Sequence, residues 1–139
     1  MFSQVSMDFA IAGASSSVER SVCKYFQLCN QADFWAVANL FADQGQMVPP
    51  FEGSIVGRDA IRRYLRSEAH NLQLMPASGN CLVQSDGNSH VQVVGKVSTL
   101  LFQVNVRWSF LITPQGEILQ LAIELLASLQ ELAQLQQMV

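Results

Sequence analysis

The chain has 139 residues, of which 50% are hydrophobic and only 14% are charged, and its formal net charge is −3. This length suits one domain with a substantial core. The acidic balance argues against a nucleic-acid partner, and no apolar run is long enough for a transmembrane helix. The low charged fraction predicts a large apolar interior, an apolar ligand, an oligomer interface, or several of these together.

Compartment and redox state follow from the N-terminus and the cysteines. Residues 1–14 have neither a basic n-region nor a sustained apolar segment, which argues against a secretory signal. Cys23, Cys29 and Cys81 lack metal-site spacing, and their odd number argues against a disulfide framework. We therefore expect a cytoplasmic protein with reduced thiols. A dimer linked through Cys23 or Cys81 is the open alternative.

The first part of the chain predicts an arm and then a helix. Residues 1–15 show no clean period, so we expect a flexible N-terminal arm followed by a single domain over residues 16–139. Ser16 and Glu19 have capping-box spacing, which predicts that the helix begins there. Its apolar stripe at helical intervals consists of Val18, Val22, Tyr25, Phe26 and Cys29.

Two more helices are predicted before the strands begin. Asp33 is a suitable N-cap for a short second helix that ends at residues 42–45. The side chains that this helix should bury are Phe34, Val37, Leu40 and Phe41. Two prolines within residues 47–51 predict an extended edge segment. Residues 57–68 predict a third helix, whose four arginines we interpret as a solvated face.

The middle of the chain predicts extended structure. Residues 71–76 and 80–84 are expected to be strands, and an Asp-Gly turn then leads into a longer strand over residues 89–101. Gly95 shares the apolar face of this longer strand. The missing side chain is expected to leave room for something to approach the sheet.

Residues 102–127 predict two strands joined by a Pro-Gly turn at 113–116. The inner face of the first strand should carry Phe102, Val104, Val106, Trp108 and Phe110. The inner face of the second should carry Leu119, Leu121, Ile123 and Leu125. Residues 129–138 then predict an amphipathic tail helix. Three helices followed by mostly antiparallel strands predict an α+β cone with an apolar mouth.

The apolar wall of this cone offers neutral donors rather than catalytic groups. The sequence contains no paired metal-ligand spacing, nucleophile elbow, P-loop or dinucleotide-binding loop. It does place Tyr25 on the first helix and Trp108 on the facing sheet. A carbonyl oxygen on an otherwise apolar ligand would suit both donors. The alternative is that both are core residues whose polar tips reach a backbone carbonyl or water.

Two other classes of function stay open. A small isomerase- or cyclase-type enzyme on the same cone needs an acid in the pocket. The sequence predicts that Glu124 faces away from Trp108 and that Asp33 is a helix cap, which argues against the enzyme. A structure with Asp33, Glu52 or Glu124 inside the cavity would favour it. A dimeric interaction module without a ligand would have a collapsed cavity.

Seven motifs occur along the chain in the order of one known family. They are YFQLCNQADF at 25–34, PPFE at 49–52, IVGRDAI at 55–61, EAHNLQLMP at 68–76, GKVST at 95–99, WSFL at 108–111 and AIELLAS at 122–128. Together they resemble the C-terminal domain of the cyanobacterial orange carotenoid protein. The resemblance implies a nuclear transport factor 2-like cone, and a free-standing homologue of that domain, which is a ketocarotenoid carrier.

The resemblance also implies a site. The family holds the carotenoid keto oxygen with a tyrosine and a tryptophan, which correspond to Tyr25 and Trp108. Tunnel-lining positions carry over to Leu72, Leu74, Thr99 and Ile123, and we expect the apolar neighbours Leu101, Phe110 and Leu125 to line the tunnel as well. The chain departs from the family near Leu101, where the family has a second tryptophan and a longer, glycine-rich loop. This departure bears on docking to an N-terminal pigment domain.

The expected function is therefore that of a non-enzymatic carrier with a photoprotective or antioxidant role. It would transfer a ketocarotenoid of the canthaxanthin or echinenone type between the thylakoid membrane surface and a helical carotenoid protein. Such a pigment is about as long as this domain is wide, given a radius of gyration of roughly 14 Å. The resemblance accordingly implies a homodimer that shares one carotenoid.

Overall fold

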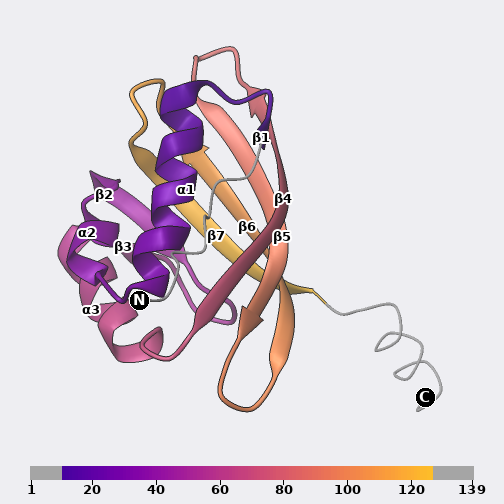
Figure 1. Cartoon of the computed structure of the whole chain (residues 1–139). Helices are drawn as coiled ribbons and strands as arrows, with labels where there is room; N and C mark the ends of the chain where they lie inside the picture. The colour runs from indigo at the N-terminus through magenta and orange to yellow at the C-terminus, as the bar shows by residue number, and fades with distance from the viewer. Residues whose placement is uncertain (1–10, 127–139) are drawn as a thin grey trace, which may run out of the picture.

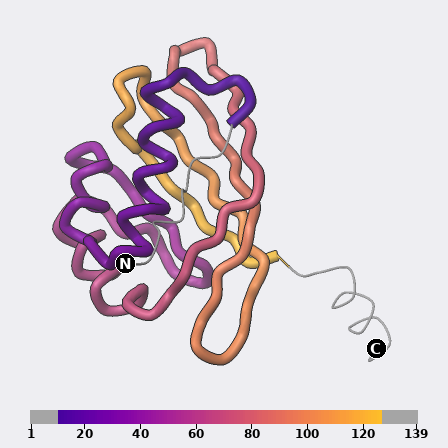
Figure 2. Tube along the Cα trace, viewed as in Figure 1, coloured from indigo at the N-terminus to yellow at the C-terminus, as the bar shows by residue number. Residues whose placement is uncertain are grey.

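In the computed structural model, which describes residues 11–126, one curved sheet wraps around a long helix (Figure 1, Figure 2). The helices are α1 Ser16–Asn30, α2 Phe34–Ala38 and α3 Arg58–Glu68. The strands are β1 Ile11–Ala12, β2 Phe41–Val48, β3 Ile55–Val56, β4 Gln73–Val83, β5 Ser89–Ser98, β6 Gln103–Ile112 and β7 Ile118–Leu126. No helix in this part of the chain is long and apolar enough to cross a membrane.

Helix α1 buries the stripe expected of it, since Val18, Val22, Tyr25, Phe26 and Cys29 are all buried. Its cap differs from the prediction. Ser15, with an extended backbone, accepts a hydrogen bond from the amide of Val18, so Ser16 is already helical. Glu19 accepts from the amide of Ile11 instead of closing a capping box.

The expected arm over residues 1–15 includes part of the fold. Ile11 is buried, and residues 11–12 form β1, which pairs in parallel with β4. The ordered domain therefore includes residues before 16. Residues 1–10 and the expected tail helix at 129–138 lie outside the described residues.

Helix α2 is shorter than predicted. Asp33 caps it, as expected, by accepting a hydrogen bond from the amide of Ala36 at 3.2 Å. The helix ends at Ala38, and Phe41 begins strand β2 instead of continuing the helix. Strand β2 pairs in parallel with β7, a partner far along the chain, and this pairing overrides the local helical pattern.

Helix α3 buries Ile61 and Leu65 and keeps its arginines on the outside, as predicted. Arg62 and Arg63 both pair with Asp59, at 2.9 and 3.3 Å. Arg58 pairs with Asp43, and it also donates to the backbone carbonyl of Phe41 at 2.8 Å. This last bond ties the start of α3 to the start of β2.

The seven strands form one sheet in the order β1-β4-β5-β6-β7-β2-β3. Among the strands of residues 11–126, only the β1–β4 and β2–β7 pairs are parallel, so the predicted α+β cone with a mostly antiparallel sheet is confirmed. The two segments expected at 71–76 and 80–84 form one strand, β4, with an irregularity between Pro76 and Ser78.

The irregularity in β4 changes the interpretation of Gly95. A side-chain carbon on Gly95 would collide with the carbonyl oxygen of Met75 and would lie 2.8 Å from the Cα of Pro76. The space beside this glycine is therefore filled by the neighbouring strand, and the expectation of room for a ligand there is wrong. Glycine is needed because two backbones approach each other closely.

The inner face of the sheet supplies most of the core. Val91, Val93, Val106, Trp108 and Phe110 alternate inward along β5 and β6 and are buried against α1. On β7 the register shifts next to Ile112, so Ile118 and Leu121 are buried where Leu119 and Leu121 were expected.

Candidate ligand-binding site

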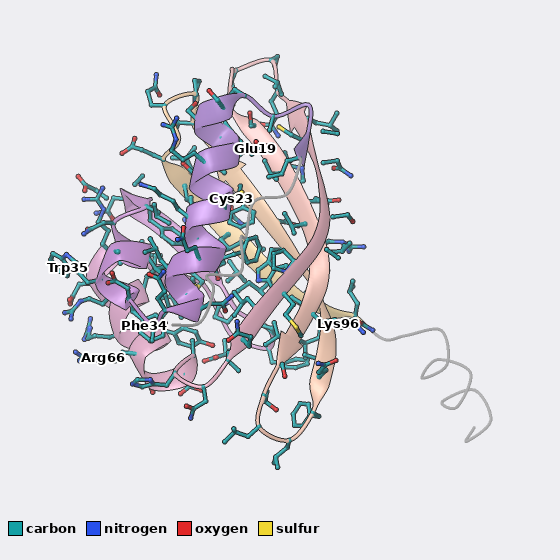
Figure 3. All side chains as sticks on the ribbon, in the orientation of Figure 1. Glu19, Cys23, Phe34, Trp35, Arg66 and Lys96 are labelled. Atoms are coloured by element: carbon teal, nitrogen blue, oxygen red, sulfur yellow. The ribbon has the colours of Figure 1, made fainter. Side chains whose placement is uncertain are left out.

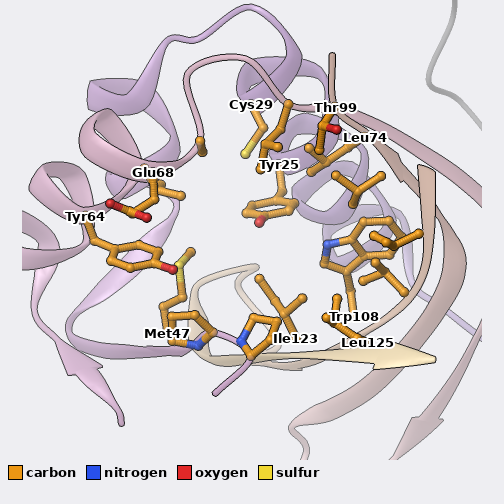
Figure 4. A pocket seen from close by; sticks show the side chains of 18 residues that line it. Tyr25, Cys29, Met47, Tyr64, Glu68, Leu74, Thr99, Trp108, Ile123 and Leu125 are labelled. Atoms are coloured by element: carbon orange, nitrogen blue, oxygen red, sulfur yellow. The ribbon is translucent and has the colours of Figure 1, made fainter. Parts of the chain in front are cut away.

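An apolar pocket of about 220 Å³ lies between the inner face of the sheet and the helices α1 and α3 (Figure 4). Of the 18 side chains that line it, most are aliphatic or proline. Those with a polar group are Tyr25, Cys29, Tyr64, Glu68, Thr99 and Trp108. The cavity is thus open space, not a collapsed interface, and it is suited to an apolar molecule with very few polar atoms.

Tyr25 reaches the pocket from the buried stripe of α1. Its ring packs edge-on against Phe26 and Phe110, with ring centroids 5.3 and 5.4 Å apart, and its hydroxyl points into the cavity (Figure 4). Burial raises the pKa of the Tyr25 hydroxyl well above its usual value, and the neighbouring Cys29 thiol raises it further. Tyr25 therefore stays protonated and neutral across the physiological range.

Trp108 reaches the pocket from the opposite wall, on β6. Only 1% of its surface is exposed, its ring packs edge-on against Phe26 at 4.8 Å, and its indole nitrogen points into the cavity (Figure 4). Within residues 11–126 no hydrogen-bond acceptor is found for this nitrogen. Among the same residues, every fully buried side-chain nitrogen or oxygen has a hydrogen-bond partner. The indole nitrogen has none, so it is not fully buried and its N–H is accessible from the pocket.

Seven of the nine side chains named from the sequence line this one pocket. They are Tyr25, Leu72, Leu74, Thr99, Trp108, Ile123 and Leu125. Leu125 is 44% exposed, which places it where the pocket opens to solvent. The residues that strand alternation and the helical stripe placed on the inner faces thus line the same cavity.

Leu101 and Phe110 lie elsewhere. Strand β5 ends at Ser98, so Leu101 stands beyond the wall, in the β5–β6 loop, where it is 89% exposed. Phe110 shares the inner face with Trp108 but is fully buried beneath Tyr25 and outside the lining. Its role is to support the Tyr25 ring, and the expectation that these two residues line the tunnel is not met in this structure.

Sequence reasoning missed several lining residues. Val97, Val104 and Val106 continue the alternating inner face, so the strand pattern contained the signal for them. Met47 lies on β2, and Pro49 and Pro50 follow directly after this strand, whose position depends on its distant pairing with β7. Tyr64 and Glu68 are four residues apart on α3 and therefore share one face, but the pattern there is dominated by Ile61 and Leu65.

The carboxylates considered for catalysis do not line the pocket. Asp33 caps α2, Glu52 accepts a hydrogen bond from Tyr64 at 2.9 Å, and Glu124 pairs with Arg107 at 3.4 Å. Among the described residues Glu68 is the one acid in the lining, and its side chain is exposed. The same part of the chain holds no cluster of three potential metal ligands.

In a cone of this kind, an apolar cavity between the helices and the inner face of the sheet is where small-molecule sites commonly lie. Residues 17–124 match the nuclear transport factor 2 (NTF2) domain model, so the chain belongs to the NTF2 family. The fold expected from the seven motifs is therefore confirmed.

Within this family the chain is similar to orange carotenoid proteins. It is 39% identical over 116 residues to the orange carotenoid-binding protein of Synechocystis sp., covering 81% of this chain and 37% of that protein. The structure of the orange carotenoid protein of Anabaena (Nostoc) sp., which binds canthaxanthin, superposes with a TM-score of 0.77 at 40% identity, covering 90% of this chain and 41% of that one. The chain is a homologue of the C-terminal domain of these proteins.

The chain spans about two fifths of the length of the curated relatives that it matches. More distant neighbours share only the fold. A ketosteroid isomerase-like protein from Erwinia carotovora atroseptica superposes with a TM-score of 0.64 at 17% identity, covering 81% of this chain and 96% of that one. The fold alone therefore does not decide between a binding protein and an enzyme.

Proposed function

We propose that this protein binds a ketocarotenoid, of the canthaxanthin or echinenone type, and carries it between the thylakoid membrane surface and a helical carotenoid protein in the cytoplasm. The role would be photoprotective or antioxidant. The observation that supports this proposal is the pair of donors, Tyr25 and Trp108, that point into an otherwise apolar pocket. The indole N–H opens onto the pocket and has no acceptor within residues 11–126, so a ligand that brings one oxygen could accept its hydrogen bond.

The two donors suit a keto oxygen because neither carries a charge. Tyr25 keeps its proton, since its pKa is raised, and an indole has no charged form at neutral pH. A neutral carbonyl can therefore be buried between them without desolvating an ion. The aliphatic walls formed by Leu72, Leu74 and Ile123 would contact the apolar remainder of the ligand.

The size of the pocket supports a shared ligand. Its volume of about 220 Å³ is below the roughly 300–1,000 Å³ of sites that enclose a whole drug-sized molecule. One domain would thus hold a terminal ring and the first part of the polyene, and the rest would leave through the opening beside Leu125. A second copy of the chain could cover that part, which is why we propose a homodimer around one carotenoid.

The placement of the carboxylates supports binding over catalysis. An isomerase or cyclase needs a proton-transferring group within reach of the substrate. Asp33, Glu52 and Glu124 lie outside the pocket lining, and Glu68 lies at its exposed rim. This arrangement therefore favours a carrier over an isomerase or cyclase.

The test is production of the protein in a bacterial host that makes canthaxanthin. We expect a coloured purified protein whose absorption is shifted to longer wavelength relative to the pigment in organic solvent, and mass spectrometry should identify canthaxanthin in the extract. A parallel sample from a host that makes only β-carotene, which has no keto group, should bind much less pigment. A colourless protein that also takes up no canthaxanthin from loaded vesicles would contradict the proposal.

A further inference from the structure

The loop between β5 and β6 exposes three apolar side chains in a row. Leu100, Leu101 and Phe102, here named the hairpin tip, are 86%, 89% and 58% exposed. This loop ends the long hairpin at the bottom of Figure 1, beyond the body of the sheet. Soluble proteins rarely expose consecutive large apolar residues without a partner, so the hairpin tip is a candidate interaction site.

The backbone of the hairpin tip is turned inward onto Thr99. The Oγ1 atom of Thr99 accepts hydrogen bonds from the amides of Leu101 and Phe102, each at 3.1 Å, and donates to the carbonyl of Phe102 at 3.0 Å. The amide of Thr99 also donates to that carbonyl at 2.8 Å. The loop thus hides several backbone polar groups while it presents its apolar side chains outward, as a segment must when it enters lipid.

The hairpin tip also adjoins the ligand pocket. Thr99 lines the pocket, and the shallow hollow bordered by the hairpin tip shares Thr99, Leu72 and Glu68 with the pocket lining. Whatever covers the hairpin tip is therefore placed next to the pocket. The exposed hairpin tip and the cavity thus border each other at Leu72 and Thr99.

We propose that the hairpin tip inserts into the interfacial layer of a lipid bilayer and holds the pocket against the acyl chains. An apolar ligand could then move between bilayer and pocket without crossing water. Lys96, near the end of β5, and Arg66, in the last turn of α3, make no ion pair within residues 11–126 and add an attraction to anionic lipid, opposed by Glu68 (Figure 3). The role in moving a ligand rests on the proposed function, but the binding of the hairpin tip to lipid does not.

The small size of the hairpin tip favours a bilayer over a second protein surface. Each partner in a standard protein interface buries roughly 800 Å², which three side chains cannot supply. A bilayer needs no complementary shape, and each inserted apolar side chain contributes independently. The structure therefore assigns the hairpin tip to lipid and not to a second copy of the chain.

The experiment is flotation of the ligand-free full chain with vesicles of phosphatidylcholine, alone or mixed with phosphatidylglycerol. The tip variant is Leu100→Ser combined with Leu101→Ser. The matched control is Leu82→Ser combined with Val83→Ser, because these exposed residues lie next to the turn at the other end of β5. We expect the wild type and the control to float with vesicles, and the tip variant to partition about tenfold or more weakly.

The proposal is overturned if the wild type binds neither kind of vesicle, or if the tip variant and the control bind equally well. If the tip variant changes only the oligomeric state in size-exclusion chromatography, the hairpin tip is a protein surface and the proposal fails. Loading of canthaxanthin from detergent solution separates the two ideas. If the tip variant loads normally from detergent but slowly from vesicles, both carotenoid binding and lipid insertion are supported. If the wild type binds vesicles but takes up no pigment, only the proposed function is contradicted.

Discussion

The side-chain amide of Asn30 makes two hydrogen bonds with the backbone of Leu74. It donates to the Leu74 carbonyl at 2.9 Å and accepts from the Leu74 amide at 2.7 Å. Asn30 is the last residue of α1, and Leu74 lies at the start of β4. Within residues 11–126 no strand pairs with the outer edge there, because β1 pairs with residues 79–80. One side chain thus fixes the helix that carries Tyr25 to a strand that lines the pocket.

Replacing Asn30 by Ala should destabilise the protein. Two hydrogen bonds are lost and two partly buried backbone groups lose their partner, which should cost about 2–3 kcal/mol. Urea denaturation measures the free energy of unfolding. The matched control is Asn39→Ala, on an exposed residue, for which a change within about 0.5 kcal/mol is expected. Equal losses for the two variants would show that the link to Leu74 contributes nothing.

Replacing Trp108 by Phe should weaken the binding of a ketocarotenoid. Phenylalanine keeps most of the packing against Phe26 but removes the N–H that points into the pocket. A net hydrogen-bond contribution of about 0.5–1.5 kcal/mol predicts roughly two- to tenfold weaker binding and a shifted absorption spectrum. Trp35→Phe is the control, because Trp35 is 66% exposed and points away from the body (Figure 3). An unchanged spectrum in Trp108→Phe would remove this residue from the site.

Tyr25→Phe combined with Trp108→Phe should reveal whether the two donors share one acceptor. If both bind the same keto oxygen, the energetic effects of the two single substitutions should not add in the double variant. Binding titrations with canthaxanthin on the four proteins give the coupling free energy, which we expect to be at least about 0.5 kcal/mol. Strict additivity would mean that the donors act on different atoms or that only one of them binds.

The parts of the site that lie on regular elements could be predicted from local patterns. Tyr25 stands on a helical stripe, and Trp108 stands on an alternating strand; each periodicity correctly identified the buried face. The same alternation could not tell how far along β6 the pocket extends. Phe110 shares the face of Trp108, yet it lies two residues further along, where Tyr25 covers it, and only the three-dimensional packing decides this.

The errors concern features that depend on distant partners. The end of α2 at Ala38 is decided by the pairing of β2 with β7, and the close approach to Gly95 is decided by an irregularity in β4. Neither partner is near in sequence, so no local window contained the signal. The placement of Leu101 failed for a different reason, because strand β5 ends at Ser98 and the alternation stops with it.

The free energy of unfolding should fall at alkaline pH. Burial raises the pKa of the Cys29 thiol to about 12, whereas an exposed thiol titrates near roughly 8.5. Between these values the folded protein keeps a proton that the unfolded chain has lost, so unfolding releases a proton and stability decreases as pH rises. Below about 8.5 both states hold the proton and the contribution is complete.

Urea titrations between pH 7 and 11 measure this effect. Above the pKa of Cys29 in the unfolded chain, the expected slope is about −1.4 kcal/mol per pH unit. The slope should steepen above roughly pH 10, where unfolding also releases the proton of Tyr25, whose pKa is raised in the folded protein. Cys29→Ala should abolish the first part of the slope and keep the second. A variant with the same slope as the wild type between pH 9 and 10 would show that another group is responsible.

Replacing Gly95 by Ala should be strongly destabilising. The new methyl group would collide with the carbonyl oxygen of Met75 and approach the Cα of Pro76, and backbone atoms held in a sheet cannot move away as a flexible side chain can. We expect a loss of about 1–3 kcal/mol or more, together with weaker ligand binding, because β4 and β5 both line the pocket.

The matched control for this last substitution is Gly53→Ala. A side-chain carbon at Gly53 would meet no atom within 4 Å, so the substitution should leave stability unchanged or raise it by up to about 1 kcal/mol through the unfolded state. Thermal and urea denaturation of both variants measure the difference. If Gly95→Ala is as stable as Gly53→Ala, the two strands do not pack as closely beside Met75 as described, and Gly95 could then provide the open space that its position on the inner face first predicted.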